Sequence, residues 1–457
     1  MTERSLTANN VGVAAGTLAS RVTGLARLVV FAAVIGQTAL ADAFDVGNNA
    51  PNVIYELLLG GTLAAALVPL FVGLHERSDR DGVAAVFGTG LVALAGLTVI
   101  AVVAAPLVFR VYALSPAGDV PLFHSVGTAL TRVFLLQIFF YGLNALAAAA
   151  LNARGKFFVA AWAPVAANLV AIAALLAIQN DAGIGSIDLA AASAGSTLYW
   201  WFTLGPTAGI ATMAMIVVAA AVRSDALPMP RFAPGHEAVR RLTRVSGWAI
   251  GYIAANQIAL IVVKNLAEPG SGRLDAYAKA MTIFQLPHGL LAVTIATTAT
   301  PLLARAAEQR DTTAFGSQFA RGARQTLMLT IPPSIALATM AQPIVRLLLG
   351  WGSFSDDAVS STARALTGLA FGLAGFSMYL FALRGFYSHG DTRIPFFINC
   401  TENLLNIVLA VVLVRRYDVL GLGLAFAIAY LASALLALEL LHRVHATPRL
   451  RELWKTR

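Results

Sequence analysis

The sequence predicts an all-α polytopic membrane protein with about twelve transmembrane helices, arranged as two pseudo-symmetric six-helix lobes around a central cavity. Three observations predict this fold. Of the 457 residues, 58% are hydrophobic and only 12% are charged, which leaves too little polar surface for a soluble protein. Apolar segments of membrane-spanning length recur along the whole chain. The two halves of the chain also resemble each other.

The apolar segments set the predicted spans, because each crossing of the hydrocarbon layer needs roughly 20 residues. The spans are predicted at 9–36, 42–74, 83–112, 125–152, 157–178, 190–222, 238–264, 274–305, 317–349, 358–385, 394–414 and 418–442. Residues 1–223 then form an N-lobe with spans one to six. Residues 224–241, rich in proline and basic residues, form a cytoplasmic linker, and 242–457 form a C-lobe with spans seven to twelve and a short basic tail.

The loops differ in charge on the two sides of the membrane. Basic residues gather in alternate loops, as at Arg77 and Arg80 or at Arg154 and Lys156, whereas the intervening loops are mainly acidic. The positive-inside rule therefore places both termini in the cytoplasm. The net charge of +9 is attributed to these loops rather than to nucleic-acid binding.

Three pairs of similar segments relate the two halves. The pairs are SRVTG (Ser20–Gly24) with TRVSG (Thr243–Gly247), LLLGGTLAAALVPL (57–70) with LPHGLLAVTIATTATPL (286–302), and ARGKFFVAAWAPVAANLV (from Ala153) with HGDTRIPFFINCTENLLN (from His389). The last pair aligns Gly155 with Gly390 and Asn168 with Asn403. Because each half has an even number of spans, the halves are predicted to be parallel repeats with a cavity between them.

Two arginines interrupt the first span. Steps of three along a helix place Arg21, Gly24 and Arg27 in one sector of its surface. Charges at bilayer depth are costly and usually face a bundle interior or a water-filled cavity. Their planar guanidinium groups suit phosphate or pyrophosphate. The alternative for Arg27 is that its side chain extends to a membrane interface.

The second span carries one polar stripe. Asp45, Asn49, Asn52 and Glu56 are spaced by four, three and four residues, with Asp42 beside them. We interpret the stripe as the wall of a cavity that faces the arginines. In the alternative interpretation, Asp42 and Asp45 only begin a helix, near its positive end.

The second half offers further charged groups within spans. Lys264 and Lys279 would add positive charge, although Lys264 could lie at the outer surface and Lys279 could extend to an interface. Glu402 has Asn399, Asn403 and Asn406 around it, a set that can hold Na⁺ or carry a proton. The alternative is an interhelical hydrogen-bond cluster.

Catalysis has little support in the sequence. Cys400 is the single cysteine, and the seven histidines form no HExxH pair, so we expect no metal site and no bound cofactor. A phosphate-binding P-loop and a GxSxG motif are also absent from the sequence. A membrane transporter rather than an enzyme is therefore predicted.

Several segments resemble one known family. SRVTGLAR, ADAF and NNAPNVIYELLLGGTLAAALVPLF resemble the opening signature of the MurJ (MviN) lipid II flippases, which belong to the multidrug/oligosaccharidyl-lipid/polysaccharide exporter superfamily. FQLPHGLLAVTIATTATPLLAR resembles the family's eighth span, and LLLGWGSFS its ninth-to-tenth loop. The resemblance implies a two-lobe carrier, open alternately inward and outward. Such a carrier lies in the bacterial cytoplasmic (inner) membrane and moves the undecaprenyl-pyrophosphate-linked peptidoglycan precursor, lipid II, across it. The resemblance also implies that transport is driven by membrane potential or by a coupled cation, Na⁺ or H⁺.

The resemblance also implies roles for particular residues. The family's first-span arginines fall on Arg21 and Arg27, and its second-span acid falls on Asp42. Tyr55 and Gly60 stand where the family's commonest form has an arginine and a glutamate. Many members have fourteen spans, whereas about twelve are predicted here. Lys279 is nearest to an eighth-span arginine. The predicted substrate-binding residues are Arg21, Arg27, Asp42, Asn52, Glu56 and Lys279, and the candidate cation site is Glu402, Asn399 and Asn403.

Together with this resemblance, the sequence predicts an alternating-access flippase for lipid II. The resemblance implies a role in peptidoglycan biosynthesis and in cell-wall and cell-shape maintenance. Its expected partners are lipid II, membrane lipids and cell-wall synthesis proteins, with no nucleic acid. One alternative is a cation-coupled exporter of a drug or of another polyprenyl-linked glycan, using Asp42, Asp45 or Glu402 for the cation. The other is a transport-inactive scaffold that recruits cell-wall enzymes.

Overall fold

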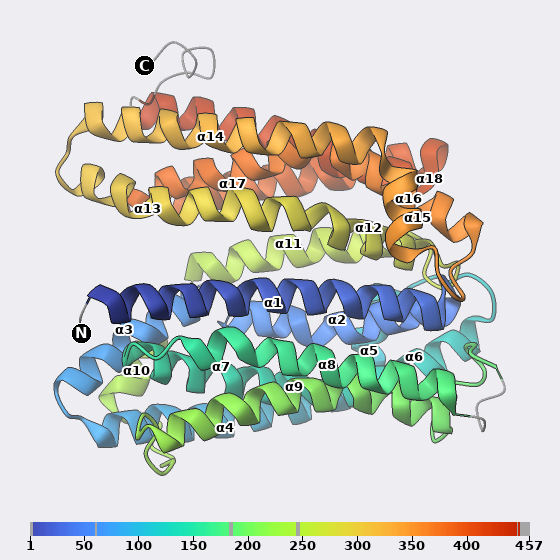
Figure 1. Ribbon diagram of the computed structural model, residues 1–457, viewed down its shortest axis with the longest axis horizontal. Coiled ribbons are helices and arrows are strands. Elements are labelled where there is room, and N and C mark those ends of the chain that lie inside the picture. The colour runs from blue at the N-terminus through green and yellow to red at the C-terminus, as the bar shows by residue number, and fades with distance from the viewer. Residues whose placement is uncertain (1–2, 60–61, 182–185, 244–246, 446, 448–457) are drawn as a thin grey trace. The chain divides into compact units, whose positions relative to one another are not determined.

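A computed structural model describes residues 3–59, 62–181, 186–243, 247–445 and 447. These residues form helices joined by short turns and loops, and they contain no β-strand, which confirms the predicted all-α class (Figure 1). The chain divides into two compact units. Unit 1 comprises Met1–Gly247 with Trp351–Phe354, and unit 2 comprises Trp248–Gly350 with Ser355–Arg457.

Unit 1 contains ten helices among the described residues. They are α1 (Glu3–Ile35), α2 (Ala39–Leu59), α3 (Thr62–Glu76), α4 (Arg80–Val103), α5 (Ala105–Tyr112), α6 (Val120–Phe134), α7 (Gln137–Ala153), α8 (Phe158–Asn180), α9 (Thr197–Arg223) and α10 (Glu237–Thr243).

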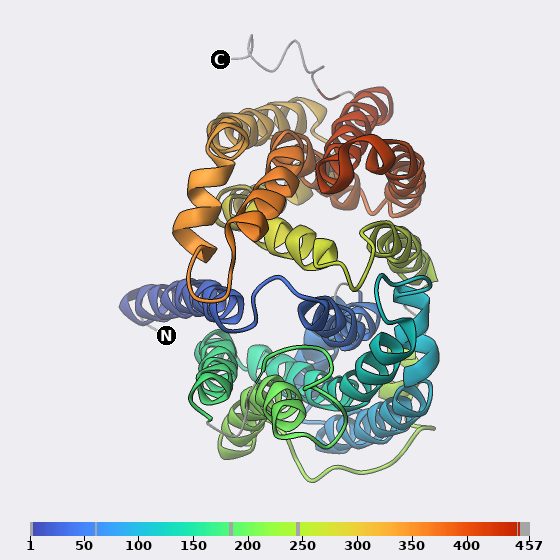
Figure 2. The same cartoon turned by 90° about the vertical axis from the view of Figure 1, so that its right-hand side faces the viewer.

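Unit 2 contains the remaining helices. They are α11 (Gly247–Leu266), α12 (Arg273–Pro287), the π-helix η1 (His288–Ala292), α13 (Val293–Glu308), α14 (Thr312–Thr339), α15 (Ala341–Leu349), α16 (Asp356–Ala370), α17 (Leu373–Ser388) and α18 (Arg393–His445). The last two predicted spans form α18, whose helical backbone is interrupted at Asp418 (φ 54°). Viewed nearly end-on in Figure 2, the helices of each unit pack as a bundle.

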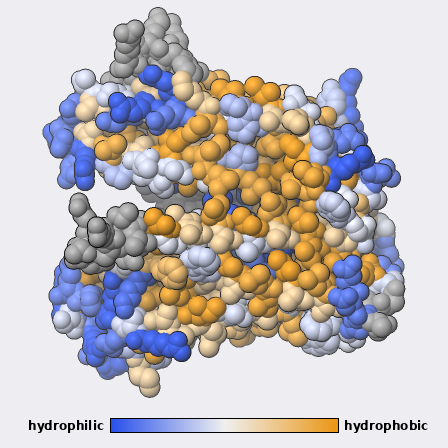
Figure 3. Space-filling view, viewed as in Figure 1, coloured by the Kyte–Doolittle hydropathy of each residue, from blue (hydrophilic) through white to orange (hydrophobic). Residues whose placement is uncertain are grey.

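The predicted spans coincide with single helices or with runs of consecutive helices. Within the described residues, seven helices are long and apolar enough to cross a membrane, or up to nine if each bent pair is one span. The predicted span 317–349 bends by 80° between α14 and α15. Pro343 explains why a straight helix does not continue there, because proline has no N–H to donate to the preceding turn. Figure 3 shows hydrophobic residues along the middle of the helices and hydrophilic residues at their ends.

Side-chain caps fix where several helices begin. The carboxylate of Asp79 accepts a hydrogen bond from the Gly82 N–H (2.7 Å) at the start of α4, and Asp311 accepts one from the Ala314 N–H (2.8 Å) at the start of α14. Each cap satisfies one of the N–H groups that a helix leaves without an intrahelical partner. These caps therefore stabilise the first turns of α4 and α14.

The residues that follow α9 pack against unit 1. The Arg231 N–H donates to the Ala84 carbonyl (3.0 Å), and the Ala233 N–H donates to Thr89 Oγ1 (3.1 Å). Ala226 and Leu227 are buried in the same hydrophobic cluster as the cores of α4, α7 and α9. Further along, α10 contacts α3 and α4. The predicted linker at 224–241 is thus held along α4 through its first ten residues, rather than extending freely between the units.

Replacing Gly88 by alanine is expected to destabilise this packing. A Cβ atom at Gly88 would lie 2.4 Å from the Arg231 backbone nitrogen, and a backbone cannot rotate out of the way as a side chain can. Overpacking of this kind typically costs about 1–3 kcal/mol of unfolding free energy. Gly96→Ala on the same helix is the matched control, because nothing lies within 4 Å of its Cβ position. Thermal unfolding in detergent should show a lower midpoint for Gly88→Ala only, and equal midpoints would contradict the docked linker.

The internal repeat is visible in local structure. In the turn between α7 and α8, Gly155 has φ 71° and donates to the Asn152 carbonyl, and in the turn between α17 and α18, Gly390 has φ 74° and donates to the Tyr387 carbonyl. Both glycines adopt the left-handed conformation that other residues rarely adopt. The repeat pair at Thr243–Gly247 includes residues 244–246, which lie outside the described residues. The remaining pair, 57–70 with 286–302, includes the end of α2 at Leu59 in the first half and η1 in the second half.

A segment from the second half of the sequence belongs to unit 1. Trp351–Phe354, between α15 and α16, clusters with unit 1, and the Ser353 N–H donates to the Ala33 carbonyl near the end of α1 (2.8 Å). Gly352 has φ 59°, and a Cβ atom there would lie 2.3 Å from the same carbonyl oxygen. This close approach therefore requires glycine.

Candidate substrate and cation sites

The helices that carry the first-span arginines and the polar stripe meet at one end. α1 packs along α8, α2 packs along α6 and α7, and α9 contacts both α7 and α8. Near the α1–α2 turn the ring of Phe31 lies 4.8 Å from that of Phe44, and Phe202 of α9 lies 4.9 Å from Phe44. Phe134 of α6 completes the group, 5.3 Å from Phe44. This four-ring phenylalanine cluster holds α1 and α2 together at their connected ends.

Arg27 lies one helical turn before Phe31, beside this cluster. Its side chain is exposed, and that of Arg21 is half-buried. Tyr141 of α7 is close enough to Arg27 to interact with it electrostatically. Among the described residues neither guanidinium group forms an ion pair. Two planar groups of hydrogen-bond donors are thus available to an anionic ligand.

The polar stripe on α2 is half-buried. Asp45, Asn49 and Asn52 are each partly accessible, and the Asn52 amide donates to the Asn48 carbonyl (3.2 Å). Asp42 is fully buried, with 0% exposure, so its carboxylate acts within unit 1 rather than at an open surface. The side chain of Glu56 lies outside the described residues.

A buried glutamine on α7, which the sequence analysis did not single out, links α2 to α7 and α9. Gln137, 1% exposed, donates to Asn48 Oδ1 of α2 and to Thr207 Oγ1 of α9, at 3.3 Å each. Its only sequence signal is a long amide within an apolar stretch, just after the break between α6 and α7. Arg27 and the stripe helix therefore both adjoin α7, through Tyr141 and Gln137 respectively.

Lys279 occupies a different environment from the predicted one. It is 2% exposed and forms an ion pair with Asp275, which is 4% exposed and lies one turn earlier on α12. Lys264 is likewise buried, at 5%. A buried ammonium needs a charged partner, and Asp275 supplies it. The position of Lys279 therefore gives no support to its predicted role in substrate binding.

Glu402 lies among amide side chains in unit 2. We call this group the amide cluster: Asn256, Asn399, Glu402, Asn403 and Asn406. The four residues on α18 are between 0% and 7% exposed. Asn256 Oδ1 on α11 accepts hydrogen bonds from the amides of Asn399 and Asn403, at 3.0 Å each. These two bonds tie α18 to α11, as the hydrogen-bond interpretation of the sequence predicts.

The cluster also holds oxygen atoms that these bonds do not use. Within the part of the chain that the structure describes, Glu402 Oε2, Asn399 Oδ1 and Asn406 Oδ1 are buried and have no hydrogen-bond partner. Buried oxygens without donors are costly. A proton on Glu402, or a hard cation shared by the carboxylate and the amide oxygens, would satisfy them. These carboxylate and amide oxygens are thus suitable ligands for Na⁺, and the carboxylate can instead take up H⁺.

Comparison with known proteins identifies the family. The sequence profile described as "Lipid II flippase MurJ" matches residues 31–456. The chain belongs to the MurJ family. The "Probable lipid II flippase MurJ" of Rhizobium meliloti (strain 1021) is 31% identical over 433 residues, which are 93% of this chain and 78% of that protein. The "Lipid II flippase MurJ" of Burkholderia cenocepacia is 28% identical over 388 residues, 83% of this chain and 72% of that protein.

Solved structures agree on the fold. The structure titled "Lipid II flippase MurJ, inward closed conformation" superposes with a TM-score of 0.79 at 20% identity, covering 97% of this chain and 89% of that one. An inward-facing multidrug resistance MATE family transporter of the MOP superfamily has a TM-score of 0.76 at 16% identity, with 96% of both chains covered. The profile match confirms the predicted membership of the MurJ family. The solved structures confirm the two-lobe fold predicted from the sequence.

Proposed function

We propose that this chain is an alternating-access flippase that moves lipid II across the cytoplasmic membrane. The observation that carries the proposal is the match of the MurJ family profile to residues 31–456. The described site is consistent with such a substrate, because Arg21 and Arg27 offer guanidinium groups at bilayer depth that form no ion pair within the described residues. Charges in this position usually serve a transport pathway.

The polar parts of the substrate have counterparts in unit 1. The pyrophosphate would bind the guanidinium groups of Arg21 and Arg27 through charge-assisted, bidentate hydrogen bonds. Asn49 and Asn52, half-buried on α2, would donate to and accept from the sugar hydroxyls. The prenyl chain would remain in the lipid bilayer, because moving this apolar chain into water is unfavourable. The phenylalanine cluster closes the end at which α1 and α2 meet.

The amide cluster in unit 2 is proposed as the site of the coupling ion, either Na⁺ or H⁺. Binding of a cation there would satisfy Glu402 Oε2 and the amide oxygens of Asn399 and Asn406. A membrane potential adds about 2.3 kcal/mol per charge per 100 mV to any step that carries charge across the bilayer. Both termini are proposed to be cytoplasmic, in accordance with the distribution of Lys and Arg among the loops.

Flipping of fluorescent lipid II in proteoliposomes tests the function. Protein-dependent movement of lipid II, with slower movement of a neutral prenyl-linked glycan and no export of a cationic dye, is the expected result, because the arginines select an anion. Movement of the dye instead would favour the drug-exporter alternative. A well-folded protein that moves neither lipid II, nor the neutral glycan, nor the dye would favour the scaffold alternative. The interaction with cell-wall synthesis proteins stays a prediction.

A further inference from the structure

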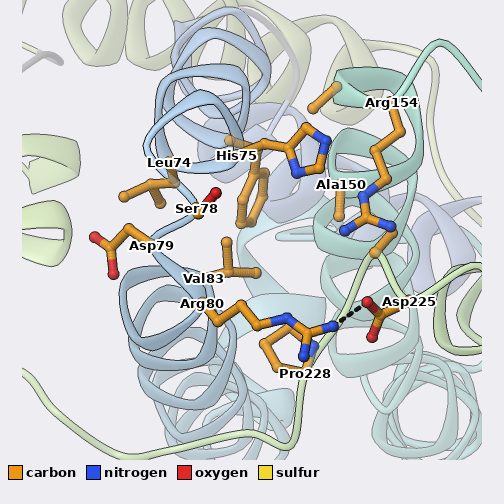
Figure 4. A pocket seen from close by; sticks show the side chains of 13 residues that line it. Leu74, His75, Ser78, Asp79, Arg80, Val83, Ala150, Arg154, Asp225 and Pro228 are labelled. Carbon is orange, nitrogen blue, oxygen red and sulfur yellow. Dashed lines mark hydrogen bonds and ion pairs between the residues drawn. The ribbon is translucent and has the colours of Figure 1, made fainter.

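A cavity lies at the end of unit 1, remote in sequence from Arg21 and Arg27. Its volume is about 270 Å³, and it is formed where α3, α7 and α9 end and where α4 begins. We call it the end pocket. It is lined by Phe71, Leu74, His75, Ser78, Asp79, Arg80, Val83, Ala150, Ala153, Arg154, Asp225, Ala226 and Pro228 (Figure 4).

The end pocket has an apolar floor and a cationic rim. Phe71, Leu74 and Val83 belong to the buried core of unit 1 and form the floor. At the rim, Figure 4 shows His75 and Arg154 on one side and Arg80 reaching across to Asp225. An anion with an apolar part matches this division of the surface.

The charges of the rim are not balanced by its acids. Arg80 forms an ion pair with Asp225, and Arg154 Nη1 donates to the Ser224 carbonyl (2.6 Å), which carries no net charge. Asp79 accepts from the Gly82 N–H as the cap of α4, and its carboxylate points away from the two arginines (Figure 4). The pocket therefore presents two guanidinium groups and an imidazole to one carboxylate.

The position of the end pocket favours a lipid headgroup as its ligand. α4 and α9 each meet the length and composition of a membrane span, and α7 forms the second part of a third. Their ends at Arg80, Arg223 and Ala153 therefore mark the level of the headgroups. Basic pockets between span ends are suited to anionic headgroups.

We propose that the end pocket binds the phosphate ester of an anionic phospholipid, through Arg80, Arg154 and His75. The Arg80–Asp225 pair is open to solvent, with side-chain exposures of 67% and 65%. Exposed ion pairs are weak, whereas a phosphate accepts several charge-assisted hydrogen bonds, so the phosphate displaces Asp225 from Arg80.

Binding of a phospholipid in the end pocket changes how the start of the linker is held. Ser224 and Asp225 are the first residues after α9, and they are held by the same two arginines. A phosphate that takes over these guanidinium groups releases the start of the segment that connects the units. The end pocket is thus a site where membrane lipid adjusts the freedom of the linker, independently of the substrate carried.

The test measures binding to the full chain in an uncharged detergent, without lipid II. Short-chain phosphatidylglycerol is titrated, and the rise in the unfolding midpoint is recorded for the native protein, His75→Ala, Arg154→Gln and the control Arg110→Ala, an exposed arginine on α5. Loss of one charge-assisted contact is expected to weaken apparent affinity about tenfold or more in the first two variants and not in the control. Equal affinity in all four proteins overturns the proposal.

Two further arms identify the ligand and the coupling. If inorganic phosphate binds as tightly as phosphatidylglycerol, the proposed role of the lipid is overturned, and tighter binding of the lipid supports it. Trypsin cleavage after Arg231 should become faster when phosphatidylglycerol is added to the native protein and should not change in Arg154→Gln. Cleavage that does not respond to the lipid in either protein overturns the effect on the linker.

Discussion

Replacing Arg27 by alanine is expected to reduce lipid II flipping to the level of protein-free liposomes. Arg27 is exposed beside the phenylalanine cluster, and within the described residues it forms no ion pair that would make it structural. Each charge-assisted hydrogen bond to the pyrophosphate contributes about 1.5–3 kcal/mol. Loss of a bidentate pair therefore lowers the rate by at least about a hundredfold if both bonds form in the rate-limiting step.

Three companion variants make the Arg27 result interpretable. Arg27→Lys keeps the positive charge but loses the planar pair of donors, so intermediate flipping is expected. Arg21→Ala should lower flipping as Arg27→Ala does, because both arginines lie on α1 within one sector. Arg110→Ala, with an arginine exposed on α5, should flip lipid II normally. Full flipping by a folded Arg27→Ala protein would remove this residue from the substrate site.

The helices could be predicted from the sequence because they depend on local composition. Every predicted span contains enough consecutive apolar residues to be recognised without knowledge of its neighbours. The breaks within spans were harder to predict. The bend between α14 and α15 was placed inside one span, although Pro343 marks it. The interruption at Asp418 coincides with the predicted boundary of the last two spans.

Contacts between distant parts of the chain were not predictable in this way. The docking of Arg231 on Ala84 and of Ser353 on Ala33 uses backbone groups, which leave no signature in the side-chain sequence. The linker was recognised from its prolines and basic residues, but those features are the same for a free linker and for a docked one. Tertiary packing alone distinguishes the two.

In the candidate sites, too, features that depend on local sequence could be predicted, and features that depend on contacts between helices could not. The spacing of the polar stripe on one face of α2 follows from helical periodicity, which the sequence contains, whereas the exposure of Arg27 depends on how α1 packs. Lys279 could not be assigned from periodicity, because its environment depends on Asp275 and on the burial of α12. Asn256 and Gln137 were missed, since a single amide in an apolar helix acquires meaning only when its partner on another helix is known.

Glu402→Gln is expected to abolish the dependence of flipping on a cation gradient while leaving the protein folded. Glutamine has the shape of glutamate and can fill the same space on α18, but it carries no charge and takes up no proton near neutral pH. Flipping driven by a Na⁺ gradient and by a pH gradient would be measured separately. The gradient that stimulates the native protein at least about tenfold should have no effect on the variant if the carboxylate is the ion ligand.

The amide cluster offers a way to separate ion binding from simple hydrogen bonding. Asn256→Ala removes the acceptor that ties α11 to α18 but leaves Glu402 in place, so it should lower the unfolding midpoint and weaken the coupling only in part. Glu439→Gln, on the same helix and with its side chain 42% exposed, is the matched control and should behave as the native protein. If Glu402→Gln keeps its full response to the cation gradient, the cluster only holds α11 and α18 together, and the energy for transport enters elsewhere.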